Sequence, residues 1–446
     1  MSRPLGHQKR SPRVRVKPRQ AVPSRTVELE IGEIGAQGDG IARLGTDIVY
    51  VPYTVAGDRV LARIEGRRGD GLAAALVEVL VPGDARVTPP CPHFGRCGGC
   101  SLQHLADPAY AAWKRDLLIT QLSRHGLAEV PVADLVRVAP GGRRRAAFAF
   151  ARRRDGTLAG FHARASHAVV DVETCRLIDP ALEAMLPPLR ALLSAIVPDG
   201  GGGDAVAILG ENGIDLLVEA EARLDLFDRE RLAAFAESHD LARLSWRLPG
   251  AGVIDPIARR RPAVVRFAGI AVEPSPGGFL QPTLAGEAVL TGLVVAAVGR
   301  LDPVADLFSG CGTFALPLAA AGHSVHAVEG EETPLRALEA AARQAGLTLS
   351  GEIRDLARRP LLAGDLARFN ALVFDPPRAG ADAQAEQLAT AGPSVVVAVS
   401  CNPATLARDL RILVDGGYAV ESATPIDQFP WSAHLETVAV LRRRLT

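Results

Sequence analysis

The first change in the pattern of hydrophobic and polar positions comes at Thr26. From there to Val81, apolar residues alternate with polar ones, and glycines interrupt the alternation at short intervals. A period of two residues with glycine turns predicts short strands that form a small OB-like β-barrel. Barrels of this kind often bind RNA or single strands, and a purely structural barrel fits the pattern equally well.

The middle of the chain mixes helical and strand patterns. Apolar side chains from Tyr110 to Leu122 recur at helical spacing and predict a helix over 108–126. The stretch 141–160 predicts a hairpin that turns at Asp155-Gly156. It carries arginines at 143–145 and 152–154, which fit a phosphate-binding surface and a solvated strand face about equally.

From about Gly278 strands and helices alternate, which predicts a doubly wound, mostly parallel α/β sheet. The expected strands are 304–308, 324–328, 371–374 and 395–399, and the expected helices are 314–321, 334–345 and 405–413. We therefore divide the chain into an arm (1–25), a barrel (26–82), a central α+β domain (83–270) and an α/β domain (271–446). The helix at 108–126 is a candidate for packing on the last of these.

Charge is unevenly distributed, although Lys+Arg and Asp+Glu are both 50. Residues 1–25 hold eight basic residues and no acid, so the rest of the chain has an excess of eight acids. We interpret 1–25 as a disordered basic arm. No apolar run approaches the roughly 18 residues that span a bilayer, and no secretory signal is visible. We expect a cytoplasmic protein with no membrane partner and infer no obligate protein partner.

The stretch from Asp306 to Phe314 contains Gly310-Cys-Gly312 between a predicted strand and a predicted helix. Glycines there let the backbone approach a ligand closely at the helix N-terminus. Glu329 ends the next strand, where a carboxylate can accept hydrogen bonds from ribose hydroxyls. The pattern predicts a nucleoside-containing cofactor and does not separate NAD from S-adenosylmethionine.

Two further motifs follow buried strands at the edge where ligands bind. Asp375-Pro-Pro-Arg378 places a carboxylate before a rigid turn, and Ser400-Cys401-Asn402-Pro403 places a thiol before a helix. A thiol beside a helix N-terminus is expected to have a lowered pKa and to be a good nucleophile. Cys311, inside the glycine loop, is interpreted as a packing residue.

The remaining four cysteines form a third candidate site. Cys91, Cys97 and Cys100 are closely spaced, and Cys175 follows after 74 residues. Six cysteines are too few for a secreted disulfide scaffold, so clustered ones indicate metal or catalysis. Four thiolates suit Zn²⁺ or an iron–sulfur cluster, and the Cys-x5-Cys spacing is loose for zinc.

Together these motifs resemble the S-adenosylmethionine-dependent RNA 5-methyluridine methyltransferases, over residues 26–440. The likeness is greatest to bacterial members that act on 23S rRNA and carry an iron–sulfur cluster. It rests on Phe279-Leu-Gln281, on Ser400 to Leu410, and on His434-Leu-Glu436. The sequence departs from the family pattern at Pro282-Thr283, at Thr313 after the glycine loop, and at Trp431 after Phe429-Pro430.

The resemblance implies a TRAM domain at 26–82, a class I methyltransferase domain with a Rossmann-like fold, an RNA substrate, and a [4Fe–4S] cluster on Cys91, Cys97, Cys100 and Cys175. It implies Cys401 as the nucleophile and Glu436 as the general base. The implied cofactor-binding residues are Gln281, Phe308, Gly310, Gly312, Thr313, Glu329, Asp355 and Asp375. The barrel and the cysteines favour 23S rRNA over tRNA as substrate.

The implied chemistry is consistent with these residue types. Thiolate addition to C6 of uracil makes C5 nucleophilic enough to take a methyl group, and a base must then remove the C5 proton. The alternatives are a tRNA 5-methyluridine enzyme, an RNA 5-methylcytidine enzyme and a non-catalytic iron–sulfur RNA-binding protein. The 5-methylcytidine enzymes typically use a Thr-Cys and a Pro-Cys pair, and no such pair lies in the α/β domain.

Overall fold

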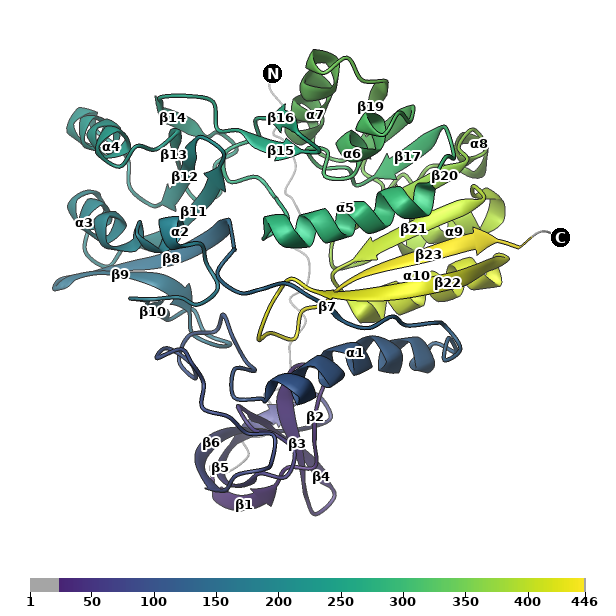
Figure 1. Cartoon of the computed structure of the whole chain (residues 1–446). Helices are drawn as coiled ribbons and strands as arrows, with labels where there is room; N and C mark the ends of the chain where they lie inside the picture. Colours follow the sequence, from purple (N-terminus) through teal and green to yellow (C-terminus); the bar gives the residue numbers. More distant parts are fainter. Residues whose placement is uncertain (1–23, 445–446) are drawn as a thin grey trace, which may run out of the picture. The chain divides into compact units, whose positions relative to one another are not determined.

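The structure, a computed structural model, describes residues 24–444 (Figure 1). Nearly all of the predicted basic arm lies outside these described residues. The chain divides into two compact units, one up to Asp84 and one from Ala85 onward, with residues 36–38 grouped with the second. Within residues 24–444, no helix combines the length and apolar character needed to cross a membrane.

The first unit is a six-stranded sheet with the strand order β1-β5-β6-β4-β3-β2. Its strands are β1 (Thr26–Glu30), β2 (Glu33–Ile34), β3 (Asp39–Leu44), β4 (Asp47–Pro52), β5 (Arg59–Arg68) and β6 (Gly71–Val81). The alternating residues Val60, Ala62 and Ile64 of β5 are fully buried in its apolar core. The predicted strands are therefore present.

The first helix of the second unit is the long helix α1 (Asp107–Arg124), and a seven-stranded sheet of order β10-β9-β8-β11-β12-β13-β14 follows it. Its strands are β8 (Arg145–Arg153), β9 (Gly156–His162), β10 (Val169–Asp171), β11 (Gly202–Gly210), β12 (Gly213–Ala220), β13 (Arg243–Arg247) and β14 (Asp255–Arg259). Helices α2 (Pro180–Glu183), α3 (Leu186–Ile196) and α4 (Leu226–Ser238) share its apolar core. A small hairpin of β15 (Val265–Phe267) and β16 (Ile270–Val272) follows.

Two arginines of the β8–β9 hairpin segment are bound by protein groups. The hairpin itself is as predicted, with Arg153 paired to Gly156. Arg144 is buried and ion-paired with Glu287, and Arg145 donates to the carbonyls of Gly277 and Gly278. Because the guanidinium groups of Arg144 and Arg145 already have protein partners, these two arginines do not face a phosphate backbone.

An eight-stranded sheet of order β19-β18-β17-β20-β21-β23-β22-β7 forms the rest of the second unit. Its strands are β7 (Val136–Arg137), β17 (Val304–Leu307), β18 (Val325–Glu329), β19 (Leu349–Ile353), β20 (Ala371–Phe374), β21 (Val395–Ser400), β22 (Tyr418–Asp427) and β23 (Glu436–Arg443). The run from β19 to β21 is parallel, and β23 is antiparallel to both β21 and β22. The predicted mostly parallel α/β sheet is confirmed.

Helices cover both faces of this sheet (Figure 1). Helices α5 (Leu284–Val298), α6 (Ala315–Ala320) and α7 (Glu332–Gln344) contribute to one apolar cluster. The second cluster, on the other face, contains side chains of α1, α8 (Ala363–Leu366), α9 (Asp382–Ala391) and α10 (Pro403–Asp415). Strands buried on both faces explain the near-continuous apolar runs of β20 and β21.

Candidate functional site

The candidate residues gather at one edge of the eight-stranded sheet. Strands β18, β17, β20 and β21 are neighbouring and parallel, so their carboxyl ends share this edge. Antiparallel β23 brings its first residues to the same edge, where Thr437 pairs with Ser400. Glu436 therefore begins its strand beside the segment that carries Cys401.

The glycine loop between β17 and α6 adopts a backbone that ordinary residues avoid. Phe308 has φ 60°, Gly310 φ 54° and Gly312 φ 107°. A Cβ on Gly312 would lie 2.6 Å from Leu338 Cδ1, so glycine is required there on two grounds. Thr313 follows as a half-buried residue just before α6. The loop thus turns at the sheet edge with Gly310 half-buried and Gly312 buried, in the region where such sheets bind nucleoside ligands.

The carboxylates at this edge have different surroundings. Glu329 accepts hydrogen bonds from the backbone N–H groups of Gly310 (2.8 Å) and Glu331 (2.9 Å), which fixes its orientation. Asp306 is fully buried, and burial holds the pKa of its carboxyl well above the usual range. Asp355 lies after β19 in an exposed turn, where it accepts from the N–H of Ala357 (3.2 Å). Asp355 shares the edge without contacting the other candidates.

Three side chains from distant segments form a polar chain next to the loop. Gln281 Nε2 lies 3.4 Å from Asp375 Oδ2, and Gln428 Nε2 donates to Gln281 Oε1 at 2.7 Å. Thr283, one of the departures from the family pattern, caps α5 by accepting from the N–H of Gly286. Gln428 was not predicted; it directly follows β22, whose end reaches the same sheet edge.

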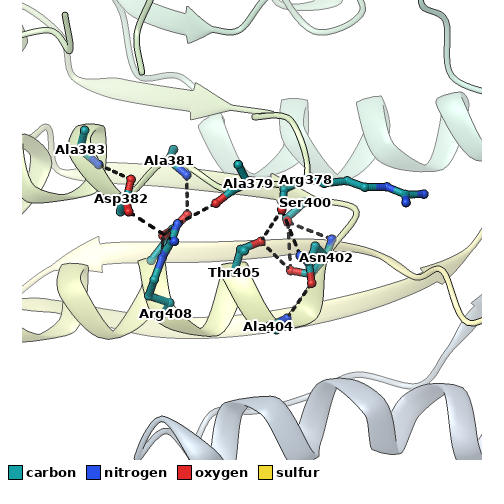
Figure 2. A network of polar contacts seen from close by, with 11 residues as sticks. Arg378, Ala379, Ala381, Asp382, Ala383, Ser400, Asn402, Ala404, Thr405 and Arg408 are labelled. Atoms are coloured by element: carbon teal, nitrogen blue, oxygen red, sulfur yellow. Dashed lines mark hydrogen bonds and ion pairs between the residues drawn. The ribbon is translucent and has the colours of Figure 1, made fainter. Parts of the chain in front are cut away.

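The nucleophile segment is bound to the loop that follows β20 (Figure 2). Asn402 caps α10 through the N–H of Ala404 and donates from Nδ2 to the carbonyl of Arg378 at 3.0 Å. Thr405 donates to that same carbonyl, at 3.3 Å. The helix begins at Pro403, earlier than the predicted 405, so Asn402 performs a capping role that was not predicted.

Cys401 lies half-buried in a pocket whose walls include Arg378, Asn402 and His434. Burial and the carboxylates of Glu436 and Asp375 raise the pKa of its thiol to about 11, while Arg378 opposes this. The expected lowering of this pKa by the helix N-terminus is therefore wrong, because desolvation and two nearby acids outweigh it. Ionisation of the thiol requires a base or added positive charge at the site.

Glu436 and Asp375 are electrostatically linked. Glu436 is buried, and burial together with the negative charge of Asp375 raises its pKa to about 8. The residue Asp375 is partly exposed, but its carboxyl group is enclosed, and desolvation raises its pKa to about 7. Two desolvated acids this close do not both ionise readily, so the pair retains a proton near neutral pH.

The loop between β22 and β23, residues 428–435, forms another wall of the site. Lys114 of α1 is fully buried, lies 2.8 Å from Asp427 Oδ1 and donates to the carbonyl of His434. Tyr110 donates to Asp427 Oδ2 at 2.7 Å and accepts from the N–H of Trp431 at 2.8 Å. A helix distant in sequence therefore holds the loop that leads to Glu436.

The ring of His434 projects toward Arg378 from this loop. Arg378 Nη2 lies 3.2 Å from its Nε2, so the ring acts as acceptor. Partial burial and the nearby cations Arg378, Lys114 and Arg143 lower its pKa to about 4. His434 is consequently neutral at physiological pH.

The four remaining cysteines meet in a separate cavity of about 260 Å³. Cys91, Cys97, Cys100 and Cys175 all line it, together with Arg143 and Arg145. Within residues 24–444 no group of three His, Cys, Asp or Glu side chains converges as ligands of one metal ion would. Cys311 is buried in the apolar cluster, which agrees with its interpretation as a packing residue.

Comparison with known proteins gives a consistent result. Residues 271–444 match the family described as tRNA (Uracil-5-)-methyltransferase. An uncharacterized RNA methyltransferase of Brucella suis is 43% identical over 94% of this chain and 99% of its own length. The 23S rRNA (uracil(1939)-C(5))-methyltransferase RlmD of Halomonas elongata is 35% identical over 93% of this chain and 89% of its own.

A solved structure supports the fold. The tRNA (uracil-54, C5)-methyltransferase of Pyrococcus abyssi, in complex with S-adenosyl-L-homocysteine, superposes with a TM-score of 0.73. The match covers 93% of this chain and 100% of that one at 22% identity. Sequence relatives and fold together show that the chain belongs to the S-adenosylmethionine-dependent RNA (uracil-C5-)methyltransferases.

Proposed function

We propose that this chain methylates C5 of one uridine in 23S rRNA through a covalent bond between Cys401 and C6. The observation that carries the proposal is the position of Glu436. Antiparallel β23 sets this buried acid at the sheet edge beside the Cys401 segment, close enough for its charge to raise the thiol pKa. A thiol and an acid with a pKa near neutrality suit a reaction that adds a nucleophile and then removes a proton.

The residues divide the reaction between them. The Cys401 thiol gives up its proton to solvent, the thiolate sulfur attacks C6 of uracil, and the electron pair displaced to C5 makes that carbon nucleophilic. S-adenosylmethionine would supply an electrophilic methyl group, which C5 takes as the sulfonium C–S bond breaks and S-adenosylhomocysteine leaves. Glu436 in its carboxylate form then removes the C5 proton, the C5–C6 double bond re-forms, and the Cys401 sulfur leaves.

Several side chains would hold the cofactor beside this centre. Glu329, already oriented by two N–H groups, would accept the ribose hydroxyls, and the backbone of Gly310 and Gly312 would approach the ligand. Four further side chains would line this proposed cofactor site: Phe308, Thr313, Gln281 and Asp375. Asp355 would reach the adenine ring.

The proposed RNA substrate must present an unstacked base. The C6 atom of a stacked uracil is not accessible, so a loop uridine flipped into the pocket is expected. We propose that 26–82 is a TRAM domain that binds RNA, that 83–270 is a central iron–sulfur and RNA-binding domain and that 271–446 carries catalysis. An rRNA substrate would also locate the enzyme in the cytoplasm.

We propose further that the four-cysteine cavity holds a [4Fe–4S] cluster. Four thiols in one cavity make up the full donor set of such a cluster, and Arg143 and Arg145 supply compensating positive charge. Burial, assisted by the charges of Cys91 and Glu183, raises the pKa of Cys175, while hydrogen bonds from the backbone at Leu177 and Ile178 lower it. A bound cation would favour the ionised form of this thiol. The visible absorbance of a brown protein would distinguish this cluster from zinc.

Incubation with S-adenosylmethionine labelled in its methyl group tests the activity. Unmodified 23S rRNA and unmodified tRNA are offered in parallel, and the digested nucleosides are separated. Label is expected in 5-methyluridine from 23S rRNA. Label only in tRNA would overturn the rRNA substrate and favour the alternative, a tRNA 5-methyluridine enzyme. No label in either RNA would overturn the proposed activity.

A second experiment tests the nucleophile. Wild-type protein should form a covalent adduct with RNA that contains 5-fluorouridine. The C5 fluorine cannot be removed by a base as the C5 proton is, so the Cys401 sulfur is not released. Cys401→Ala should form none, whereas Cys311→Ala, which alters a packing thiol, should retain the adduct. An adduct in Cys401→Ala would exclude Cys401.

A further inference from the structure

The four-cysteine cavity contacts the β22–β23 loop through the backbone. The N–H groups of Ser101 and Leu102, directly after Cys100, both donate to the carbonyl of Trp431, at 2.8 and 3.1 Å. Trp431 has φ 58°, a conformation that a non-glycine residue adopts only when its surroundings enforce it. The cysteine segment thus helps hold the loop at the point where the sequence departs from the family pattern.

Arg143 provides a second link, through its side chain. It lines the cysteine cavity, and its guanidinium carbon lies 5.6 Å from the centre of the Phe429 ring. Its backbone bonds the segment after Cys175 on both sides, donating to Leu177 and accepting from Asp179. Across residues 24–444 this guanidinium has no carboxylate partner, in contrast to Arg144. The group that this guanidinium contacts is the face of the Phe429 ring.

The loop carries this link to the nucleophile pocket. The Phe429 ring meets the His434 ring edge-on, with 5.8 Å between their centres. His434 contacts Arg378, and both line the pocket of Cys401. Glu436 follows two residues later, at the start of β23. A shift of Phe429 would therefore move one wall of the pocket, and displacements of about 1 Å are enough to slow catalysis severely.

We propose that Arg143 is a positioning residue that ties the nucleophile pocket to the four-cysteine site. Its backbone is bonded to the segment after Cys175, and its guanidinium lies over the electron-rich face of Phe429, so it holds that ring against His434. Without this contact, Phe429 and His434 lose part of their support. The inference rests on the proposed function and extends it to the control of Cys401.

A double-mutant cycle tests the coupling. Arg143→Met removes the charge at similar length, Phe429→Leu removes the ring face, and the third variant combines them. The first readout is the rate of adduct formation with 5-fluorouridine RNA. The second is alkylation of Cys401 by iodoacetamide without RNA or cofactor, followed by mass spectrometry. Each single change should slow the adduct about tenfold, and the double change should add nothing further.

Controls separate positioning from a structural defect. Arg143→Met should retain the iron and sulfide content of wild type, and Arg143→Lys should recover part of the rate because an ammonium also binds a ring face. Arg176→Gln removes an exposed positive charge from the same cavity and should behave as wild type. Multiplicative losses in the double variant, or an Arg143→Met protein with the wild-type rate, would overturn the inference.

Failure of the cluster and failure of the coupling give different results. Anaerobically purified wild-type protein without iron or sulfide would overturn the proposed cluster and leave the coupling to be decided by the cycle. A non-additive cycle in that protein would still support Arg143 as a positioning residue. An additive cycle would overturn that role as well.

Discussion

Replacing Lys114 by methionine should destabilise the protein strongly. The Lys114 side chain has no exposed surface, and Nζ lies 2.8 Å from Asp427 Oδ1 and 3.4 Å from the carbonyl of Phe429. Methionine fills a similar volume but, within residues 24–444, leaves the buried Asp427 carboxylate with the Tyr110 hydroxyl as its hydrogen-bonding side chain. Removing one partner of a buried ion pair costs about 3–5 kcal/mol, because the other charge remains desolvated.

A loss of that size changes the unfolding equilibrium at least about a hundredfold. Urea denaturation followed by tryptophan fluorescence measures it, since Trp113 lies on α1 and Trp431 lies in the loop that Lys114 holds. The second change Asp427→Asn should recover part of the loss by removing the uncompensated charge. Arg124→Met, an exposed position in the last turn of α1, should change stability by about 0.5 kcal/mol or less.

The reasoning would be refuted by a Lys114→Met protein within about 1 kcal/mol of wild type. It would also be refuted if Asp427→Asn made Lys114→Met still less stable. In the folded fraction, adduct formation with 5-fluorouridine RNA should fall as well, because the carbonyls of Phe429 and His434 lose their common donor.

Three further predictions concern the sheet edge. Burial raises the pKa of Glu436 to about 8 and of Asp375 to about 7, so the folded chain binds more protons than the unfolded one between about pH 5 and 8. The free energy of unfolding, measured by urea denaturation, should therefore fall as pH rises through this window, and Glu436→Gln should make that fall smaller. Turnover should rise toward pH 8, because the proposed base acts as a carboxylate. Gly312→Ala should weaken S-adenosylmethionine binding in calorimetry at least about tenfold, since its Cβ would lie 2.6 Å from Leu338; wild-type affinity would contradict this. Asn402→Ala should cost about 1 kcal/mol of stability and slow adduct formation. Asn402→Asp should keep the helix cap and lose only the hydrogen bond to the Arg378 carbonyl. Equal behaviour of the two variants would argue against the loop contact.

The elements of the α/β sheet could be predicted because their signals are local. The strand 371–374 has the predicted bounds, and 395–399 differs by one residue. An apolar run bounded by turn residues predicts a strand buried on both faces, even when the strands and helices that pack against it are not known. The capping of α10 was less predictable, because Asn402 competes with Thr405 as a start signal and geometry decides between them.

The site was predicted in part for the same reason. Glycines, prolines and strand-end acids are local markers, so Gly312, Glu329 and Asp375 could be named from the chain alone. Gln428 and Lys114 had no such marker. Their importance arises from contacts with Gln281 and Asp427, residues 147 and 313 positions away in the chain.

The sequence by itself determined where the strands, helices and reactive side chains occur, because period, turn residues and motif spacing are properties of neighbouring positions. Only the tertiary structure decided the pKa values of those side chains and which charged groups are bound by other protein groups. The thiol of Cys401 has a raised pKa instead of the lowered one expected, and Arg144 and Arg145 hold protein groups instead of facing solvent. Desolvation and Coulomb energy depend on distances through space, and residues that meet at this sheet edge are remote from one another along the chain.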